Sequence, residues 1–251
     1  MLLLEQIVKA GQEAIDFCFP PTCRVCESRA AQWPLCEACV SKLEALEAQP
    51  YCQLCGLPLS EHAAPCPHCL GEGVFPFDRV LRLCNYDDPV KHLIHALKFR
   101  RAWPIGEFLA DRLLARPPVQ TLLENADLIV PVPLHAMRQV QRGYNQAKVI
   151  ARRLGRRARV RVAAVAVRLA NTEAQTETHS KSQRIENLRH AFGLLDPSRV
   201  AGRRVVIVDD VRTTAATLQS FGRCIRAGKP SSIAAIVVAA ADARHSHFEA
   251  I

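Results

Sequence analysis

Short apolar runs of strand length alternate with helix-length segments along the second half of the chain. Four such runs are residues 128–130, 160–167, 205–208 and 233–241. Apolar runs of this length are typical of strands that are buried on both faces of a parallel sheet. Between them, residues 147–154 and 217–227 carry apolar side chains at helical spacing, and we expect Gly155 and Gly228 to end these helices. The alternation predicts an α/β fold with a parallel sheet flanked by helices.

A related pattern precedes this region. Residues 80–86 predict a short strand, and residues 88–101 predict a helix that begins at Pro89. A second helix, residues 105–115, is expected to end before the proline pair that starts at Pro117. One strand and two helices are therefore expected upstream of the main sheet.

These patterns divide the chain into three parts. Residues 1–73 hold an N-terminal amphipathic helix and a cysteine-rich module, residues 74–126 a hood subdomain over the main sheet, and residues 127–251 the α/β domain. Glu5 and Lys9 interrupt the apolar N-terminal segment, which argues against a signal peptide. No run of about 18 uncharged apolar residues occurs, so we expect no membrane insertion and a cytoplasmic location.

Eight of the eleven cysteines form four C-x2-C pairs. They are Cys23, Cys26, Cys36, Cys39, Cys52, Cys55, Cys66 and Cys69. Two thiolates at this spacing can face one tetrahedral site, and two pairs complete a four-thiolate shell around Zn²⁺. One or two structural zinc ions are therefore expected rather than disulfides, because nothing indicates secretion. The gaps favour two consecutive sites, and a cross-braced pairing of first with third and second with fourth stays open.

Basic residues outnumber acidic ones, and the excess is concentrated in one stretch. The chain has 33 Lys and Arg against 24 Asp and Glu, for a formal net charge of +9. Residues 138–161 contain nine of the basic residues and no acidic one. Two interpretations stay open, a solvated helix face or a surface that binds phosphates or nucleic acid.

Residues 203–218, RRVVIVDDVRTTAATL, combine a buried strand with polar chemistry. Asp209 and Asp210 should lie at the carboxyl end of this strand, where ligands bind in open α/β sheets. Adjacent carboxylates point to opposite faces of a regular strand, so a bend is needed for both to reach one ligand. Residues 213–217 form the turn into the next helix, whose free backbone N–H groups favour an anion. Paired acids that accept from a vicinal diol, next to an anion site, predict a site for a ribose 5-phosphate.

Residues 171–187, NTEAQTETHSKSQRIEN, are polar throughout and show no apolar period. A polar stretch of this length inside a compact domain is often a functional loop, here a candidate lid over the site. A plain surface loop is the alternative.

Residues 203–218 resemble the phosphoribosyl-diphosphate (PRPP) motif of type I phosphoribosyltransferases. Further features make the chain similar to the ComF/GntX family, the competence protein F relatives. They are the four-cysteine zinc module, Pro131-Val132-Pro133 followed by Arg142-Gly143-Tyr144-Asn145-Gln146, and Arg168 with Thr172, Gln175, Arg184 and Asn187. The resemblance covers nearly the whole chain. It implies a type I phosphoribosyltransferase-like parallel sheet behind an N-terminal zinc-binding module.

The resemblance also implies roles for individual residues. Residues that would bind PRPP are Val132, Pro133, Arg138, Arg142, Asp209, Asp210, Thr213, Thr214, Ala215, Ala216 and Thr217. Within this set the two acids would hold the ribose hydroxyls, residues 213–217 the 5-phosphate, and the loop and arginines the pyrophosphate with Mg²⁺. Candidate catalytic residues are Asp209, Asp210 and Arg184. The reaction implied is displacement at the anomeric carbon of PRPP.

Two positions depart from the family pattern. Ala215 stands where the family usually has Gly, and its Cβ could crowd the backbone near the phosphate. Position 213 is Thr, where the purine-salvage branch carries an acid that assists the base. This departure argues against hypoxanthine or guanine as the acceptor.

The sequence favours two functions from different classes, and a purely structural role is the third alternative. The first is a Mg²⁺-dependent phosphoribosyltransferase whose acceptor the sequence does not name. The second is a binding protein that senses PRPP or a nucleotide, or that engages single-stranded DNA during uptake through its zinc module and basic face. Because only 6% of residues are aromatic, DNA contacts would rest on phosphates and depend strongly on salt. The sequence sets no oligomeric state.

Overall fold

The computed structural model of the chain describes residues 21–31, 33–59, 65–169, 191–212 and 215–241. Some predictions fall outside these ranges, namely the N-terminal amphipathic helix, the polar loop at residues 171–187 with Arg184, and the pair Thr213 and Thr214. At Ala215 the backbone alone is described. Within the described part of the chain, no helix combines the length and the apolar character that a membrane span requires.

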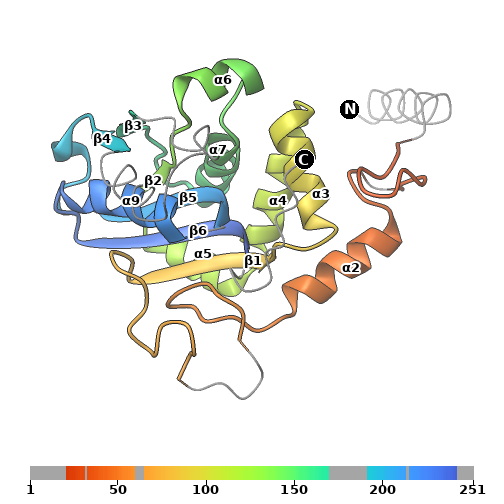
Figure 1. Cartoon of the computed structure of the whole chain (residues 1–251), viewed down its shortest axis with the longest axis horizontal. Coiled ribbons are helices and arrows are strands. Elements are labelled where there is room, and N and C mark those ends of the chain that lie inside the picture. Colours follow the sequence, from red (N-terminus) through yellow and green to blue (C-terminus); the bar gives the residue numbers. More distant parts are fainter. Residues whose placement is uncertain (1–20, 32, 60–64, 170–190, 213–214, 242–251) are drawn as a thin grey trace, which may run out of the picture.

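A four-stranded parallel sheet forms the centre of the molecule (Figure 1). In spatial order its strands are β1 (Arg79–Asn85), β6 (Ser232–Ala240), β5 (Arg204–Arg212) and β2 (Leu128–Pro131). Neighbouring strands are parallel throughout, and Val208 of β5 lies opposite Pro131 on one side and Ile236 on the other. Because both faces are covered, β5 and β6 are buried along most of their length, which explains their near-continuous apolar runs. The predicted parallel α/β sheet is confirmed.

Strand β1 comes from the segment predicted as the hood. It pairs with β6 from Arg79 opposite Ala234 to Asn85 opposite Ala240. Residues 79–85 therefore extend the main sheet. The three-part division of the chain stays a proposal, and β1 is the part of the predicted hood that belongs to the sheet.

Helices cover both faces of the sheet. The described helices are α2 (Glu37–Glu47), α3 (Val90–Phe99), α4 (Trp103–Leu114), α5 (Pro117–Glu124), α6 (Ala136–Arg142), α7 (Gln146–Ala158) and α9 (Ala215–Arg226), with a 3-10 turn, η1 (Pro197–Arg199). All the α-helices but α6, which buries no residue, contribute side chains to the core. The core cluster on one face includes Leu97 of α3, Ile150 of α7 and Val208. The cluster on the other face includes Phe221 of α9 and Ile207. Successive residues of β5 thus contribute to different cores, as the side-chain alternation of a strand requires.

The proline pair does more than end the helix before it, which corrects the prediction. Helix α4 ends at Leu114, and Pro117 and Pro118 are the first residues of α5, a helix that the sequence analysis missed. Proline is tolerated in a first turn because its missing N–H has no helical partner there and its φ is already helical.

Gly155 lies inside α7 rather than at its end, a second correction. The helix continues to Ala158, and Arg159, with φ 58°, ends it in the left-handed conformation. A Cβ at Gly155 would lie 2.4 Å from Val162 Cγ2 and 2.8 Å from the Val160 carbonyl oxygen. Glycine is needed here because the returning chain passes directly over the helix.

The Val-rich segment at residues 160–167 forms a strand only at its end. Strand β3 (Ala166–Arg168) pairs antiparallel with β4 (Phe192–Leu194) in a separate two-stranded sheet. Before it, Val162 makes an isolated parallel bridge to Ile129 of β2. The segment therefore follows the edge of the main sheet briefly and then leaves it, so the predicted eight-residue strand is too long.

The cysteine-rich part of the chain docks on the sheet and its helices. Arg112 of α4 donates to both carboxylate oxygens of the buried Glu47 of α2, at 2.9 and 2.7 Å. Farther along, the Val80 N–H of β1 donates to the Gln53 carbonyl oxygen at 2.9 Å. Figure 1 shows α2 beside the sheet and the following loops below β1. Metal-binding segments and sheet thus share one packed structure.

Candidate functional site

Asp209 and Asp210 lie in the last part of β5, which continues to Arg212. Val208 and Val211 contact the same core cluster although they are three residues apart, so the regular alternation is interrupted at the two acids. Each carboxylate accepts from the next backbone N–H, Asp209 Oδ1 at 2.9 Å and Asp210 Oδ1 at 2.8 Å. Both acids consequently line one cleft.

Lys98, near the end of α3, forms an ion pair with Asp210, and Nζ lies 3.1 Å from Oδ2. The exposed fractions of the two side chains are 23% and 12%. Burial alone would lower the pKa of Lys98, but the attraction and hydrogen bond of Asp210, helped by Asp209, outweigh burial and raise this pKa above 10.5. Lys98 is therefore charged at neutral pH and neutralises one acid.

The Pro-Val-Pro loop lies beside the acids because β2 and β5 are neighbours in the sheet. The Val132 N–H donates to the Val208 carbonyl oxygen at 2.9 Å. Asn145 holds the loop from the other side, since its Nδ2 donates to the Val132 carbonyl oxygen at 2.9 Å. The same side chain caps α7, because Asn145 Oδ1 accepts from Lys148 N at 3.2 Å. One buried asparagine thus fixes the loop relative to the next helix.

The other residues of this RGYNQ motif tie the same loop to the hood. Gly143, with φ 79°, is the left-handed C-cap of α6. The Tyr144 hydroxyl donates to the Leu97 carbonyl oxygen of α3, and burial raises the pKa of Tyr144 to about 12. The Arg142 guanidinium lies 5.2 Å from the centre of the Phe99 ring. The motif therefore joins the loop after β2 to α3, the helix that carries Lys98.

These elements enclose a cleft of about 100 Å³ at the carboxyl ends of β2 and β5. The predicted site residues that line it are Val132, Pro133, Arg138, Arg142, Asp209, Asp210 and Thr217. Ala215 and Ala216 belong to the first turn of α9, and Ala216 is not among the described residues that line the cleft. Most of the side chains proposed from the sequence thus meet at one place.

Four polar or charged lining residues were absent from the predicted site, namely Lys98, Asn145, Gln146 and Arg168. The last three stand in motifs that carry the family resemblance, so a signal for them was present. Lys98 directly follows Leu97 on the buried face of α3, and a charge beside an apolar face was the only sequence signal for it. Arg168 reaches the cleft from β3 and lies 5.6 Å from the Phe192 ring.

The cleft therefore combines two carboxylates with four cationic side chains, Lys98, Arg138, Arg142 and Arg168. Carboxylates accept hydrogen bonds from hydroxyl groups, and guanidinium groups bind phosphate oxygens. The arrangement suits a ligand that carries both a diol and several negative charges.

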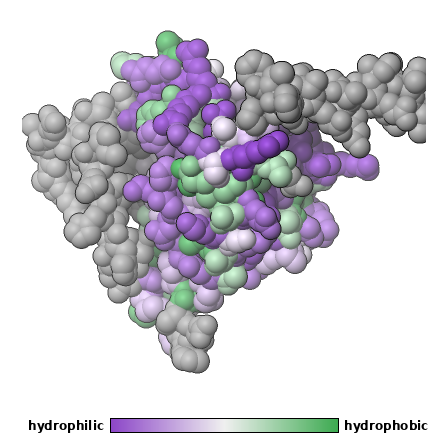
Figure 2. Space-filling view, turned by 90° about the vertical axis from the view of Figure 1, so that its right-hand side faces the viewer, coloured by the Kyte–Doolittle hydropathy of each residue, from purple (hydrophilic) through white to green (hydrophobic). Residues whose placement is uncertain are grey.

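A second cavity, of about 310 Å³, adjoins this cleft on the side of α3. It shares Lys98, Arg138 and Arg142 with the cleft and adds Phe99, Arg101 and Gln141. The Phe99 side chain is 61% exposed, and its ring lies 4.8 Å from that of His95. We call these six lining residues the basic rim. Figure 2, which faces the side where α3 lies, shows hydrophilic residues gathered in its upper part, where α6 stands.

The eight paired cysteines form two separate groups, in each of which the sulfurs lie within 4.8 Å of one another. The first cluster is Cys23, Cys26, Cys36 and Cys39, and the second cluster is Cys52, Cys55, Cys66 and Cys69. The first C-x2-C pair therefore groups with the second and the third with the fourth, so the two sites are consecutive and not cross-braced. Four sulfurs at about 2.3 Å from Zn²⁺ lie about 3.8 Å apart in a tetrahedron. The observed separations are 3.5 and 3.7 Å in the first cluster and 3.8 Å for both pairs in the second, so both clusters fit zinc.

Comparisons with known proteins agree with both parts of this description. Residues 140–250 match the phosphoribosyl transferase domain, and residues 14–70 match the double zinc ribbon domain. The chain is 34% identical over 213 residues to the DNA utilization protein YhgH of Escherichia coli O6:H1, covering 82% of this chain and 91% of that protein. The chain belongs to the ComF/GntX family of competence protein F relatives. Within this family it is 32% identical over 202 residues to competence protein F of Haemophilus influenzae, covering 76% and 84% of the two chains.

A more distant ComF/GntX relative is similar over an even larger share of the chain. Identity to competence protein ComFC of Bacillus subtilis is 29% over 237 residues, covering 86% of this chain and 93% of that protein. The likeness therefore extends over the zinc ribbons and the sheet together, as expected for parts that are packed against each other.

Proposed function

We propose that this ComF/GntX-family protein binds PRPP, or a related ribose 5-phosphate compound, with Mg²⁺ in the cleft at the ends of β2 and β5. The observation that carries the proposal is the meeting of Asp209 and Asp210 with three arginines and Lys98 around one cleft. PRPP carries a diol, a phosphate and a pyrophosphate, so each kind of side chain has a partner on it. The phosphoribosyl transferase domain matched at residues 140–250 supports the same assignment.

The ribose and its 5-phosphate occupy the side of the cleft formed by β5 and α9. Asp209 and Asp210 accept hydrogen bonds from the two ribose hydroxyls. The N-terminus of α9, with Thr217 lining the cleft, receives the phosphate. A helix N-terminus favours an anion because its first backbone N–H groups have no partner within the helix.

The pyrophosphate occupies the opposite side, next to the Pro-Val-Pro loop. Arg138, Arg142 and Arg168 supply guanidinium groups there, and Asn145 holds the Val132 carbonyl so that the loop keeps its shape. Mg²⁺ would neutralise charge on the pyrophosphate, and the oxygen-only donor set of the two acids suits a hard cation held through water.

Lys98 changes partner in this proposal. In the free protein its ammonium group neutralises Asp210 at 3.1 Å. When the ribose hydroxyls donate to the Asp210 carboxylate, the Lys98 ammonium group leaves Asp210 and binds phosphate oxygens instead. Lys98 lines both the cleft and the neighbouring cavity, so its ammonium group can move between them. Lys98 thereby keeps the empty site electrically balanced and adds a cation to the filled one.

Phosphoribosyl transfer is the reaction that this site would support. An acceptor nucleophile forms a bond to the anomeric carbon of the ribose, and the bond to pyrophosphate breaks with its electron pair leaving on pyrophosphate. The side chains contribute position and neutralisation of the leaving charge. The acceptor enters from the neighbouring cavity, whose lining includes the exposed ring of Phe99.

Thermal unfolding with PRPP and Mg²⁺ tests the binding site. We expect a raised melting temperature, and we expect Asp209→Asn with Asp210→Asn to abolish the shift. No shift at millimolar PRPP would refute the site. Pyrophosphate release with a panel of bases, amines and nucleic acids then separates an enzyme from a binding protein.

A second candidate function is binding of single-stranded DNA in DNA uptake, for which the names of the competence and DNA utilization relatives are one motive. The basic rim is the structural motive. It joins four cationic side chains to an exposed aromatic ring, the combination that binds backbone phosphates and stacks a base. The cytoplasm stays the expected location.

The basic rim, which takes Arg138 and Arg142 from the predicted basic stretch at residues 138–161, suits DNA better than the arginine-rich helix α7 in the same stretch. On α7, Arg153 binds Asp111 through two hydrogen bonds of 2.8 and 2.7 Å, and Arg156 binds Glu107 at 2.6 Å. These acids of α4 neutralise much of the basic stretch. Fluorescence anisotropy with a labelled oligonucleotide tests the idea, because affinity should fall steeply with salt. Affinity that ignores salt would refute binding through phosphates.

A further inference from the structure

Two arginines are buried in the sheet near its contact with the second cluster. Arg82 of β1 is 0% exposed and Arg212, the last residue of β5, is 6% exposed. Arginine is almost never fully buried unless its charge is compensated, because an unpaired charge in the interior is very costly. Each guanidinium group therefore requires an anionic partner.

Carboxylates do not supply this partner. Among the described residues, no ion pair within 4.0 Å joins either Arg82 or Arg212 to an Asp or Glu, and Nε and Nη2 of Arg82 and Nη1 of Arg212 have no hydrogen-bond acceptor. The partners of Arg82 among the described side chains are neutral, namely Asn85, which accepts a hydrogen bond, and the Tyr51 ring at 5.2 Å. The two guanidinium groups also repel each other.

The second cluster lies in a segment packed against β1, the strand that carries Arg82, and both arginines interact electrostatically with its cysteines. Its segment is fixed on β1, because the Val80 N–H donates to the Gln53 carbonyl and a Cβ at Gly56 would lie 2.8 Å from Val80 Cγ1. Burial lowers the pKa of Arg82 to about 10, and Coulomb attraction to Cys84, Tyr51 and Cys55 opposes this shift. Burial raises the pKa of Cys84 and of Tyr51, so both are neutral at pH 7, whereas Cys55 is charged when it binds metal as a thiolate. Burial likewise lowers the pKa of Arg212, opposed by Cys55 and Cys69.

We propose that the zinc–thiolate centre of the second cluster is the counter-ion of Arg82 and Arg212. Four thiolates around one Zn²⁺ carry a net charge of two minus, which matches two buried guanidinium groups. The arginines in turn stabilise the thiolates as ligands. They are thus positioning residues of the metal site, although both are far from the cysteines in sequence.

This pairing links the metal to the proposed phosphate site. Arg212 is two residues beyond Asp210 on β5, and α9 begins at Ala215 immediately after it. Loss of zinc from the second cluster would leave one uncompensated charge on β1 and one at the end of β5, the strand that carries the paired acids. The second zinc therefore stabilises the sheet itself as well as the zinc ribbon.

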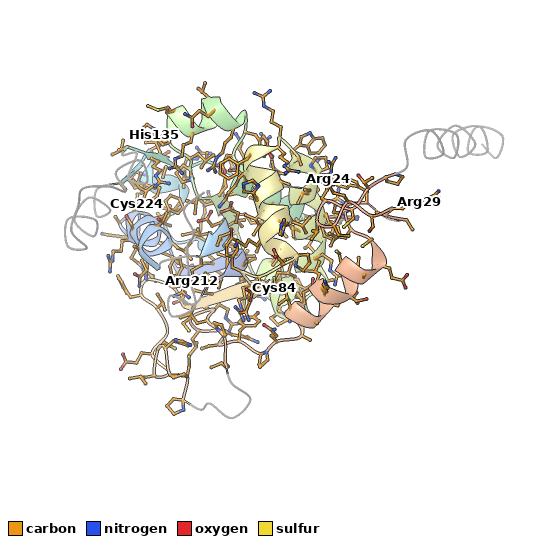
Figure 3. The ribbon with its side chains drawn as sticks, turned by 45° about the vertical axis from the view of Figure 1, so that its right-hand side comes forward. Arg24, Arg29, Cys84, His135, Arg212 and Cys224 are labelled. Carbon is orange, nitrogen blue, oxygen red and sulfur yellow. The ribbon has the colours of Figure 1, made fainter. Side chains whose placement is uncertain are left out.

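The first cluster offers an internal contrast. Its nearest arginines in sequence, Arg24 and Arg29, are both solvent-exposed, and within the described part of the chain no Arg or Lys besides Arg82 and Arg212 is buried. Figure 3 shows Arg29 at the outer edge of the molecule and Arg212 at the sheet. Substitution of arginines should therefore affect the two clusters differently.

Zinc release from the full-length, zinc-loaded protein to a chelating dye tests the proposal. Removing a partner that orients and neutralises metal ligands typically weakens metal binding by about 10- to 100-fold. We expect Arg212→Gln, and Arg82→Met with Arg212→Met, to release one zinc equivalent at least about tenfold faster and to leave the other unchanged. Alkylation of cysteines, followed by mass spectrometry, identifies the cluster that opened, which should be the one with Cys55 and Cys69.

Two controls separate charge from packing. Arg212→Lys keeps the positive charge and should release zinc at nearly the wild-type rate. Its comparison with Arg212→Gln tests the proposal even if the double variant, Arg82→Met with Arg212→Met, does not fold. Arg24→Met with Arg29→Met should change neither equivalent. Equal release rates for Arg212→Gln and Arg212→Lys, or faster release from the first cluster, would overturn the proposal. Because the readout is zinc, the result does not depend on whether the cleft binds PRPP.

Discussion

Lys98 of the hood helix α3 lies 3.1 Å from Asp210 of β5, so the counter-charge of the PRPP-like motif comes from a segment more than a hundred residues away in the sequence. The pair joins an element that follows β1 to the strand at the centre of the sheet. It also places a cation where the cleft meets the basic rim. Lys98 is therefore the residue through which the hood and the ligand site are electrostatically connected.

Lys98→Met should weaken both folding and PRPP binding. The variant leaves Asp210 beside Asp209 without its cation, which should lower the free energy of unfolding by about 1–3 kcal/mol, toward the low end because the pair is partly exposed. Calorimetric titration with PRPP and Mg²⁺ should show weaker affinity. Lys91→Met on the exposed face of α3 is the matched control and should behave like the wild type.

The pH dependence of this pair follows from the raised pKa of Lys98. Its contribution to stability is fully present below the ordinary value of 10.5 and is lost as the pH rises through the higher folded value. The stability difference between wild type and Lys98→Met should therefore be constant from pH 7 to pH 9. A difference that disappears within this range would contradict the ion pair.

Asn145→Ser should separate the two roles of this side chain. Serine can still cap α7 through its oxygen, but it is too short to replace the hydrogen bond to the Val132 carbonyl. We expect a melting temperature close to that of the wild type and clearly weaker PRPP binding. Asn145→Ala loses the cap as well and should cost about 1 kcal/mol in stability. Unchanged PRPP affinity in both variants would mean that the loop keeps its shape without Asn145.

Gly155→Ala should destabilise the fold without touching the cleft. The new Cβ would lie 2.4 Å from Val162 Cγ2 and 2.8 Å from the Val160 carbonyl oxygen, so backbone must move. Overpacking of this kind costs about 1–3 kcal/mol, which denaturant unfolding measures directly. Arg152→Ala, on the exposed side of the same helix, is the control. Stability equal to that of the control would show that the crossing segment can shift freely.

Glu47→Gln should loosen the attachment of the first zinc ribbon to the hood. The substitution leaves Arg112 of α4 without the carboxylate that now accepts two hydrogen bonds. Loss of such a partly buried, bidentate pair should cost about 1–3 kcal/mol. Hydrogen exchange should then increase in α2 and α4 and stay unchanged in β5. Equal protection of α2 in both proteins would show that its apolar contacts alone hold it.

Substitutions in the basic rim should reduce affinity for single-stranded DNA more than substitutions on α7. Arg101→Ala removes a phosphate partner and should lower the slope of affinity against salt by about one charge, whereas Phe99→Ala removes a stacking surface and should leave this slope unchanged. Arg152→Ala with Arg156→Ala is the comparison. A larger loss from the α7 pair would place the DNA site on α7 rather than on the basic rim.

Local patterns were sufficient for much of the fold. The apolar runs at residues 128–130, 205–208 and 233–241 are strands of the predicted parallel sheet, because a strand buried on both faces leaves an apolar signature of its own. Local patterns gave wrong predictions where a contact with another segment determines the secondary structure. Gly155 continues a helix since Val162 passes over it, and residues 160–167 leave the sheet after a single bridge.

The sequence by itself determined the kinds of candidate site and where along the chain to look for them. The cysteine spacing predicted eight metal ligands, and the acid pair after an apolar strand indicated the end of the sheet at which to look, because ligand type and strand position are encoded in adjacent residues. Only the tertiary structure decided how distant residues combine. The grouping of the cysteines, the meeting of Lys98 with Asp210 and the burial of Arg82 and Arg212 beside the second cluster depend on contacts between segments far apart in the chain, which no local pattern specifies.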